Sequence, residues 1–149
     1  MSTPSGRRMA IDPGSVRVGV ALTDPHRIIA SPLVTLATDG AASAISEIAR
    51  ENEVSVIYVG LPLNLSGKEG SSAQFAIEFA RTLSHVIDLP IRLLDERLTT
   101  STASAIARSS GGRATKENID QLAATELLEF ALAQEKQRDD LAGVDLEAR

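Results

Sequence analysis

Two apolar segments joined by a Pro-Gly-Ser turn lie near the start of the chain and constrain its fold more than any other feature. Residues 8–12 and 17–23 are rich in aliphatic side chains, and the turn at 13–15 is typical of a sharp reversal, so they predict an antiparallel hairpin. Asp12 ends the first of these strands. Because an unpaired buried carboxylate is costly, Asp12 indicates a bound ion or phosphate; an Asx turn into Pro-Gly is the alternative.

The rest of the chain alternates between short apolar runs and segments with helical spacing. Strands are predicted at 28–36, where Pro32 favours an edge position, and at 54–60 and 91–96; helices are predicted at 41–51, about 72–86, about 99–108 and 115–138. A three-strand antiparallel meander followed by strand–helix alternation implies a mixed sheet with two further parallel strands and helices on both faces. We therefore expect an α/β fold.

The length and composition favour one globular domain covering 1–149, with residues 1–6 and about 140–149 flexible. Apolar residues make up 43% of the chain and charged residues 23%, and no stretch is long and apolar enough to cross a bilayer. The polar N-terminus argues against a signal peptide, and the lack of cysteine excludes disulfides and thiolate zinc sites. A cytoplasmic location is expected.

Polar side chains gather where the predicted strands end. Asp12 and Glu96 end two strands, and Asn64 follows a third. Because the carboxyl ends of parallel strands meet at one edge of a sheet, we expect these side chains to lie close together. Side chains alternate across a strand, so only one of Asp95 and Glu96 can face Asp12. We choose Glu96, partly on the resemblance described below.

A third acid lies in the predicted last helix. Asp120 shares the small-residue face of that helix with Ala123 and Ala124, so it can reach the sheet edge where Asp12 points; a first-turn acid favoured by the helix dipole is the simpler alternative. Mg²⁺ or Mn²⁺ suits such carboxylates, and two ions about 3.5–4 Å apart can neutralise both the entering and the leaving oxygen of a phosphodiester. The pattern predicts a metal-dependent phosphodiester hydrolase in which Asp12, Glu96 and Asp120 bind the metal and catalyse.

The net charge of −5 argues at first against a nucleic-acid partner, but the charge is unevenly distributed. Residues 97–116 contain four cations and no acid, whereas residues 129–149 contribute −3. Arg97, Arg113 and Lys116 could therefore follow a nucleic-acid backbone. Ordinary solvated cations on a helix and loop are an equally good interpretation.

The segment at 61–70 is irregular and carries side chains suited to holding a phosphate or a sugar. Asn64 and Lys68 supply polar and charged groups, and Gly67 allows close approach of the backbone. A plain connection between a strand and a helix is the default interpretation of this segment.

Four segments together resemble the YqgF/RuvX family of proposed Holliday-junction resolvases, also described as nucleases that mature the small-subunit ribosomal RNA precursor. In the family's order and spacing they are 11–21 (IDPGSVRVGVA), 59–67 (VGLPLNLSG), 95–100 (DERLTT) and 118–124 (NIDQLAA). The resemblance covers residues 7 to 135 approximately. It implies a ribonuclease H-like fold, which agrees with the strand order above. It also implies an acidic triad of Asp12, Glu96 and Asp120, with Asn64 and Gly67 lining the site.

Two features of the chain bear on this resemblance. The family often carries a lysine before the arginine of its first turn; Val16 occupies that place here, which leaves Arg17 as the phosphate contact. In a ribonuclease H-like sheet, the strand that ends near Leu61 should neighbour the strand of Asp12. Glu96 then lies one strand further out and must lean inward to complete the triad.

Other functions and substrates fit parts of the same pattern. The opening at 11–15 is also similar to RuvC resolvases and to the phosphate loop of actin-like ATPases, although those ATPases bind nucleotide between two such domains and this chain has length for one. A non-catalytic RNA- or protein-binding module is a third hypothesis. The sequence does not choose between a four-way DNA junction, whose two-fold symmetry favours a homodimer, and a ribosomal RNA precursor, for which a monomer suffices.

Overall fold

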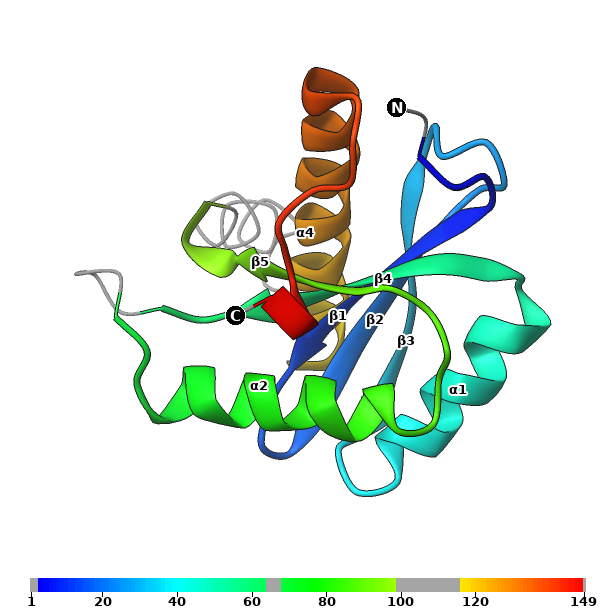
Figure 1. Cartoon of the computed structure of the whole chain (residues 1–149). Helices are drawn as coiled ribbons and strands as arrows, with labels where there is room; N and C mark the ends of the chain where they lie inside the picture. Colours follow the sequence, from blue (N-terminus) through cyan, green and yellow to red (C-terminus); the bar gives the residue numbers. More distant parts are fainter. Residues whose placement is uncertain (1–2, 64–67, 99–115, 149) are drawn as a thin grey trace, which may run out of the picture.

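A six-stranded sheet forms the centre of the molecule in the computed structural model, which describes residues 3–63, 68–98 and 116–148 (Figure 1). The strands are β1 (Arg7–Pro13), β2 (Arg17–Thr23), β3 (Ala30–Ala37), β4 (Val54–Leu61), β5 (Ile91–Asp95) and β6 (Val144–Asp145). The α-helices are α1 (Ala41–Glu51), α2 (Ser71–Ser84) and α4 (Lys116–Arg138), and short 3₁₀ turns cover Glu96–Leu98 and Leu146–Ala148. The expected helix at 99–108 lies outside the described residues.

The strand order is β3-β2-β1-β4-β5-β6. β1, β2 and β3 form the antiparallel meander, β4 pairs in parallel with both β1 and β5, and β6 adds an antiparallel strand at the far edge. The expected α/β fold is therefore confirmed, and β3 occupies an edge as Pro32 predicts.

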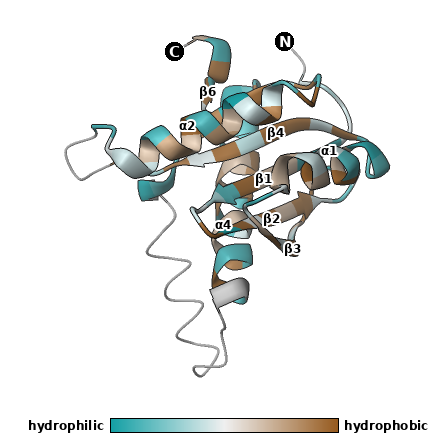
Figure 2. Cartoon of the chain, turned by 90° about the horizontal axis from the view of Figure 1, so that it is seen from below, coloured by the Kyte–Doolittle hydropathy of each residue, from teal (hydrophilic) through white to brown (hydrophobic). Residues whose placement is uncertain are grey.

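Helices cover both faces of this sheet and divide the core in two. α1 and α2 pack on one face, and α4 packs on the other (Figures 1 and 2). Figure 2 shows hydrophobic residues concentrated along the central strands, while α2 is hydrophobic along one side only. On β1, Met9 and Ile11 belong to the core under α1 and α2, whereas Ala10 belongs to the core under α4. Because strand side chains alternate, Asp12 lies on the α4 face.

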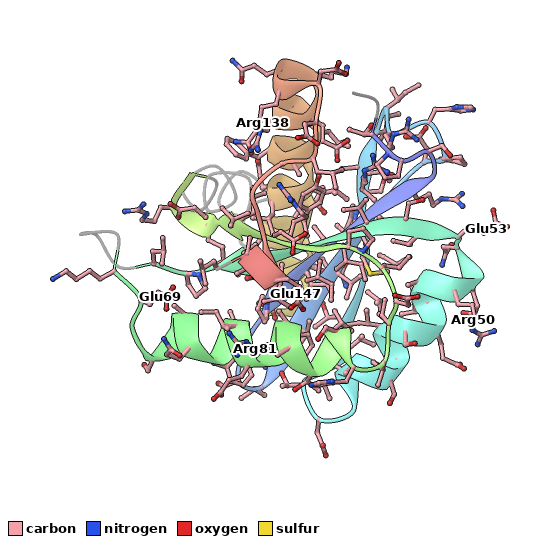
Figure 3. The ribbon with its side chains drawn as sticks, viewed as in Figure 1. Arg50, Glu53, Glu69, Arg81, Arg138 and Glu147 are labelled. Carbon is pink, nitrogen blue, oxygen red and sulfur yellow. The ribbon has the colours of Figure 1, made fainter. Side chains whose placement is uncertain are left out.

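The C-terminal segment is packed against the sheet in its described part, up to residue 148, and the flexibility expected of residues 140–149 stays a prediction. β6 pairs with β5, and Ala142 and Leu146 are 0% and 5% exposed. The Arg92 guanidinium donates hydrogen bonds to the carbonyl oxygens of Ala142 (2.7 Å) and Gly143 (2.9 Å). Figure 3 shows the chain returning from Arg138, at the end of α4, to Glu147 beside the sheet. Apolar burial and these carbonyl contacts hold the segment in place.

The N-terminal residues are also held where the structure describes them. The Ser55 hydroxyl donates a hydrogen bond to the Ser5 carbonyl, and Arg8 and Arg27 both donate to the Gly6 carbonyl, at 3.2 and 3.0 Å. These hydrogen bonds join Ser5 and Gly6 to the rest of the fold, and the flexibility expected of residues 1–6 stays a prediction. None of the helices in the described part of the chain has the length and apolar character needed to span a membrane.

Candidate active site

Asp12 lies at the end of β1 beside a close approach between β2 and α4. Its strand partner is Gly19 on β2. A Cβ atom added to Gly19 would fall on the backbone of Asp120, so the lack of a side chain there lets the first turns of α4 lie directly on the sheet. This contact brings Asp120 next to Asp12, as the small-residue face of the helix predicts.

Glu96 reaches Asp12 from β5 by crossing β4. It is the first residue after β5, and the strand between them carries Gly60 at the crossing point. A Cβ atom added to Gly60 would overlap the Glu96 carboxyl group, so this side chain occupies the space that any other residue would fill. Glu96 and Asp12 are joined by a side-chain hydrogen bond. The inward lean that the strand order requires of Glu96 is therefore present.

Burial raises the pKa of both carboxyl groups in the Asp12–Glu96 pair. Burial, the hydrogen bond to Asp12 and the charges of Asp12 and Asp95 raise the pKa of Glu96 to about 10. Burial also raises the pKa of Asp12, the Glu96 hydrogen bond opposes this rise, and the Asp120 charge adds to it. Glu96 is therefore the protonated member and donates its hydrogen bond to the Asp12 carboxylate. Two carboxylates this close do not both ionise unless a cation compensates them.

Asp120 is close enough to Asp12 to affect its pKa, but its carboxylate is paired with Arg17. The Arg17 Nε donates to Asp120 Oδ2 at 3.1 Å, and the two side chains are 34% and 25% exposed. Arg17 is expected from the sequence to contact a phosphate; in this structure it holds an acid of the candidate triad. Among the described residues, no three His, Cys, Asp or Glu side chains are gathered closely enough to form a ready metal-binding group.

The neighbouring acid Asp95 has a different role from Glu96. Its carboxylate accepts hydrogen bonds from the Arg97 guanidinium, the shortest at 2.7 Å, and from the Arg97 backbone N–H at 2.9 Å. These bonds lower the pKa of Asp95 below its ordinary value. Of the two adjacent acids, Glu96 alone joins Asp12, as the alternation predicts. Arg97, a candidate phosphate contact, pairs with Asp95.

Of the five remaining predicted site residues, the structure describes Lys68 and the backbone of Lys116. Asn64, Gly67 and Arg113 lie outside the described residues. Lys68 is exposed just before α2, and Lys116 is the first residue of α4, with its side chain outside the described part.

Gly60 is a site-forming residue that sequence reasoning does not single out. Its signal is present in the chain, since a glycine ends the apolar run at 54–60 in the strand expected beside that of Asp12. A glycine at such a position often marks a close approach by another group. What approaches it becomes clear only when the order of the strands is known.

The chain is similar to known proteins over most of its length. The model of the RuvX family, described as Holliday junction resolvase, matches residues 6–134. The chain belongs to the RuvX family. Proposed pre-16S rRNA nucleases of Clavibacter michiganensis and Thermobifida fusca are 43% and 42% identical to it, over 88% and 89% of this chain and 85% and 90% of their own lengths. A third, from Nocardia farcinica, is 46% identical over 83% of this chain and 76% of its own length.

The fold of this RuvX-family member is similar to that of solved structures. Thermus thermophilus RuvC superimposes with a TM-score of 0.57 and 12% sequence identity, covering 88% of this chain and 96% of the other. The same protein in complex with a Holliday junction substrate gives a TM-score of 0.56. At this identity the likeness establishes the ribonuclease H-like fold alone. The family match and the curated relatives support the nuclease function expected from the sequence.

Proposed function

We propose that this RuvX-family protein is a Mg²⁺- or Mn²⁺-dependent nuclease that hydrolyses phosphodiester bonds in structured nucleic acid through Asp12, Glu96 and Asp120. The observation that carries the proposal is the Glu96 side chain, which crosses β4 over Gly60 to meet Asp12. A stability role is a poor explanation of this contact, because burying two carboxyl groups together costs free energy. A site that holds a cation explains it.

The donor chemistry of this cluster fits a hard divalent cation. All three side chains offer carboxylate oxygens, and the described residues around them include no thiolate or imidazole ligand. Two of the acids are already in contact and the third lies beside them on α4. When bound, the ions supply positive charge to the phosphodiester oxygens and acidify the attacking water; one or two ions are both compatible with the proposal.

The residues themselves must change partners to hold a cation. Glu96 has to release the proton that it shares with Asp12, and Asp120 has to turn from Arg17 toward Asp12. The Arg17 guanidinium then becomes available to a phosphate, which it can hold by paired hydrogen bonds. Binding of a phosphate by Arg17 would thus free Asp120 to join Asp12 and Glu96.

Cationic and polar residues around the cluster are proposed to hold the substrate backbone. Lys68 and Arg97 have exposed side chains on the described surface near the strand ends. Arg113 and Lys116 belong to the acid-free stretch of sequence at 97–116, and Asn64 and Gly67 belong to the segment that follows β4 in the sequence. Phosphate contacts of this kind give affinity that falls with rising salt concentration.

A small-subunit ribosomal RNA precursor is the substrate that we place first. The relatives that match at 40 to 46% identity carry the name of proposed pre-16S rRNA nucleases. Such a substrate would place the protein in the cytoplasm. A four-way DNA junction is the second candidate, favoured by the description of the family.

The proposal is tested by comparing wild-type protein with Asp12→Asn in a cleavage assay containing Mg²⁺ or Mn²⁺. The substrates are an RNA precursor with a single-stranded extension, a four-way DNA junction and the linear duplex arms of that junction. Asp88→Asn, an exposed acid beyond the end of α2, is the matched control. We expect at least a hundredfold loss of cleavage for Asp12→Asn and none for the control.

Selective cutting of the RNA establishes a processing nuclease, and selective cutting of the junction establishes a resolvase. Metal-independent binding of RNA without cleavage, unaffected by Asp12→Asn, would replace the proposal with a non-catalytic binding module. Cleavage that persists in Asp12→Asn at the wild-type rate would remove Asp12 from the mechanism.

A further inference from the structure

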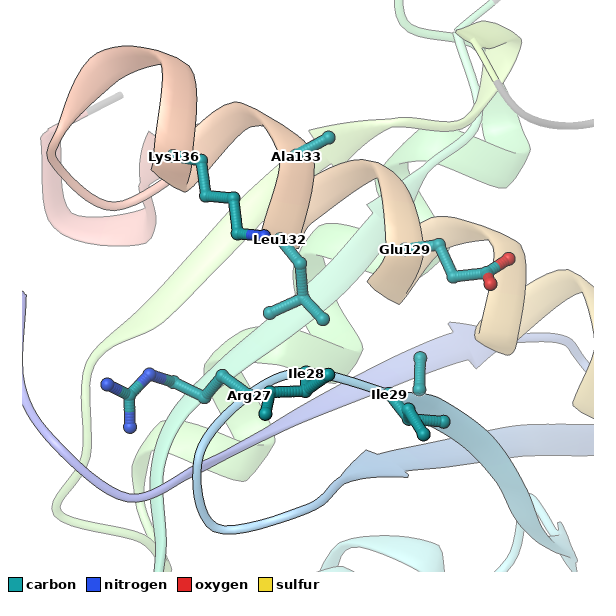
Figure 4. Close-up of a pocket in the computed structure, with 8 residues that line it drawn as sticks. Arg27, Ile28, Ile29, Glu129, Leu132, Ala133 and Lys136 are labelled. Atoms are coloured by element: carbon teal, nitrogen blue, oxygen red, sulfur yellow. The ribbon is translucent and has the colours of Figure 1, made fainter.

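A groove lies between the second half of α4 and the connection from β2 to β3, on the far part of the helix from Asp120. It has a volume of about 350 Å³ and opens to the surface (Figure 4). Its middle is apolar, formed by Ile28, Ile29, Leu132 and Ala133. Ile28 and Ile29 are 72% and 63% exposed, which is unusual for two adjacent isoleucines and marks a surface suited to contact with another protein.

The two ends of this groove carry opposite charges. Arg27 and Lys136 line one end, and Glu129 lines the other (Figure 4). Glu126 lies one turn before Glu129 on α4, and burial together with the Glu129 carboxylate raises the pKa of Glu126 above its ordinary value. The negative end of the groove thus offers the Glu129 carboxylate to a cation from a second molecule.

The charged and apolar positions on α4 are arranged symmetrically along the helix. Glu129 and Lys136 are seven residues apart, and Leu132 and Ala133 lie midway between them. Positions separated by three, four and seven residues share one face of an α-helix. If a second α4 lies antiparallel on this face, with the two-fold axis between Leu132 and Ala133, each Glu129 comes opposite Lys136 of the second copy.

We propose that the groove face, defined as residues 27–29 with the 129–136 face of α4, is a two-fold interface between two copies of this chain. A two-fold interface requires a patch that is complementary to itself, and a patch with an apolar centre and opposite charges at its ends meets this requirement. A nucleic-acid strand fits less well, because Glu129 would repel its phosphates and the centre of the groove is apolar.

This arrangement leaves both candidate active sites accessible. Asp120 lies about 12 residues before the proposed axis along α4, or roughly 18 Å at the helical rise per residue. Each acidic cluster therefore stays outside the contact and the two are related by the two-fold axis. The interface does not depend on the proposed nuclease function, and its test needs no substrate.

Sedimentation velocity tests the proposal at protein concentrations from about 1 to about 200 µM, a range in which a weak dimer dissociates. The wild-type chain should associate to a dimer with rising concentration. Glu129→Lys and Lys136→Glu should each weaken the dimer about tenfold or more, because each replaces two attractive pairs with two repulsive ones. The double variant Glu129→Lys/Lys136→Glu should restore association, because the exchanged charges again face each other.

Two further variants complete the design. Ala133→Arg places a charge at the two-fold axis and should give a monomer over the whole range, whereas Glu78→Lys, on an exposed position of α2, should behave as the wild type. Circular dichroism checks that every variant is folded. A wild type that stays monomeric at 200 µM overturns the proposal, and so does a dimer that tolerates Ala133→Arg or that the double variant fails to restore.

Discussion

The carboxyl group of Glu96 donates a hydrogen bond to Asp12 across an intervening strand, in the space left open by Gly60. The two acids come from strands that are not neighbours in the sheet, since β4 lies between β1 and β5. A small residue on the middle strand is therefore as necessary to the cluster as the acids themselves.

Gly60→Ala should displace Glu96 from Asp12, because the added Cβ atom would overlap the Glu96 carboxyl group. We expect Mg²⁺ or Mn²⁺ affinity, measured by calorimetry, to fall at least tenfold, with a cost of about 1–3 kcal/mol in the free energy of unfolding from overpacking. Gly70→Ala is the matched control, because a Cβ atom at Gly70 meets open space. Unchanged metal affinity in a folded Gly60→Ala protein would show that Glu96 does not bind the metal.

Glu96→Gln should change how the stability of the metal-free protein depends on pH. The pKa of Glu96 in the folded chain is about 10, raised from an ordinary 4.5, so the folded state holds this proton over a range in which the unfolded state has lost it. The wild type should therefore lose stability as pH rises from about 4.5 toward 10. Glutamine keeps a hydrogen-bond donor toward Asp12 without a proton to lose.

Chemical denaturation of both proteins in the presence of a chelator, from pH 5 to pH 9, measures this difference. The free energy of unfolding of Glu96→Gln relative to the wild type should increase steadily with pH. Adding Mg²⁺ should stabilise the wild type more than the variant, most strongly at the upper end of the range. A constant difference across the range would mean that Glu96 is ionised in the folded protein.

Arg17→Gln should affect substrate binding more than folding. The Arg17–Asp120 pair is partly exposed, so its loss should cost no more than about 1 kcal/mol in the free energy of unfolding. If Arg17 contacts a phosphate, the plot of log affinity for nucleic acid against log salt concentration should be less steep in the variant. The slope should fall in magnitude by about 0.9, as expected for the loss of one phosphate contact. Fluorescence anisotropy at several salt concentrations gives the slope. An unchanged slope would mean that Arg17 pairs with Asp120 and does not contact a phosphate.

A second buried ionic cluster, at the other end of the sheet, should matter for stability and not for metal binding. Arg8 is fully buried and donates to Glu135 at 2.8 and 3.1 Å, and the Tyr58 hydroxyl also donates to Glu135, at 2.5 Å. The Tyr58 oxygen in turn accepts a hydrogen bond from the Ala142 N–H at 3.0 Å. This cluster links β1, β4 and α4 to the C-terminal segment.

Glu135→Gln should cost about 3–5 kcal/mol in the free energy of unfolding, because it leaves the buried Arg8 guanidinium without a counter-charge. Tyr58→Phe should cost about 1–3 kcal/mol, because it leaves the Glu135 carboxylate and the Ala142 N–H each short of a partner. Metal affinity of the folded variants should match the wild type. A loss of affinity without a loss of stability would connect this cluster to the active site.

Leu146→Ala should destabilise the protein although it lies only three residues from the end of the chain. The Leu146 side chain is 5% exposed and belongs to the core beneath α1 and α2, so its truncation should cost about 2–3 kcal/mol. Thermal denaturation compares it with Val144→Ala, whose side chain is 55% exposed and whose loss should be nearly neutral. Equal effects of the two substitutions would show that the segment is not packed in solution.

The sequence determines by itself those features that repeat over short distances. Apolar runs bounded by turn residues predict β1, β2 and β4, and the proline at 32 predicts the edge strand. The alternation of strand side chains allows only one of Asp95 and Glu96 to face Asp12, and the family resemblance favours Glu96. Helical spacing puts Asp120 on the face of α4 that meets the sheet. The periods of strands and helices are local properties of the backbone, so neighbouring residues suffice to predict them.

The tertiary structure alone decides the contacts between distant segments. The pairing of Arg17 with Asp120 spans 103 residues, and the folding of the C-terminal segment onto β5 is not predicted from the sequence, because little in a short, charged stretch indicates burial. The role of Gly60 depends on which strand lies between Asp12 and Glu96, and the groove beside α4 depends on how the helix lies over the β2–β3 connection. Such contacts follow from the stacking of whole layers, which no local pattern specifies.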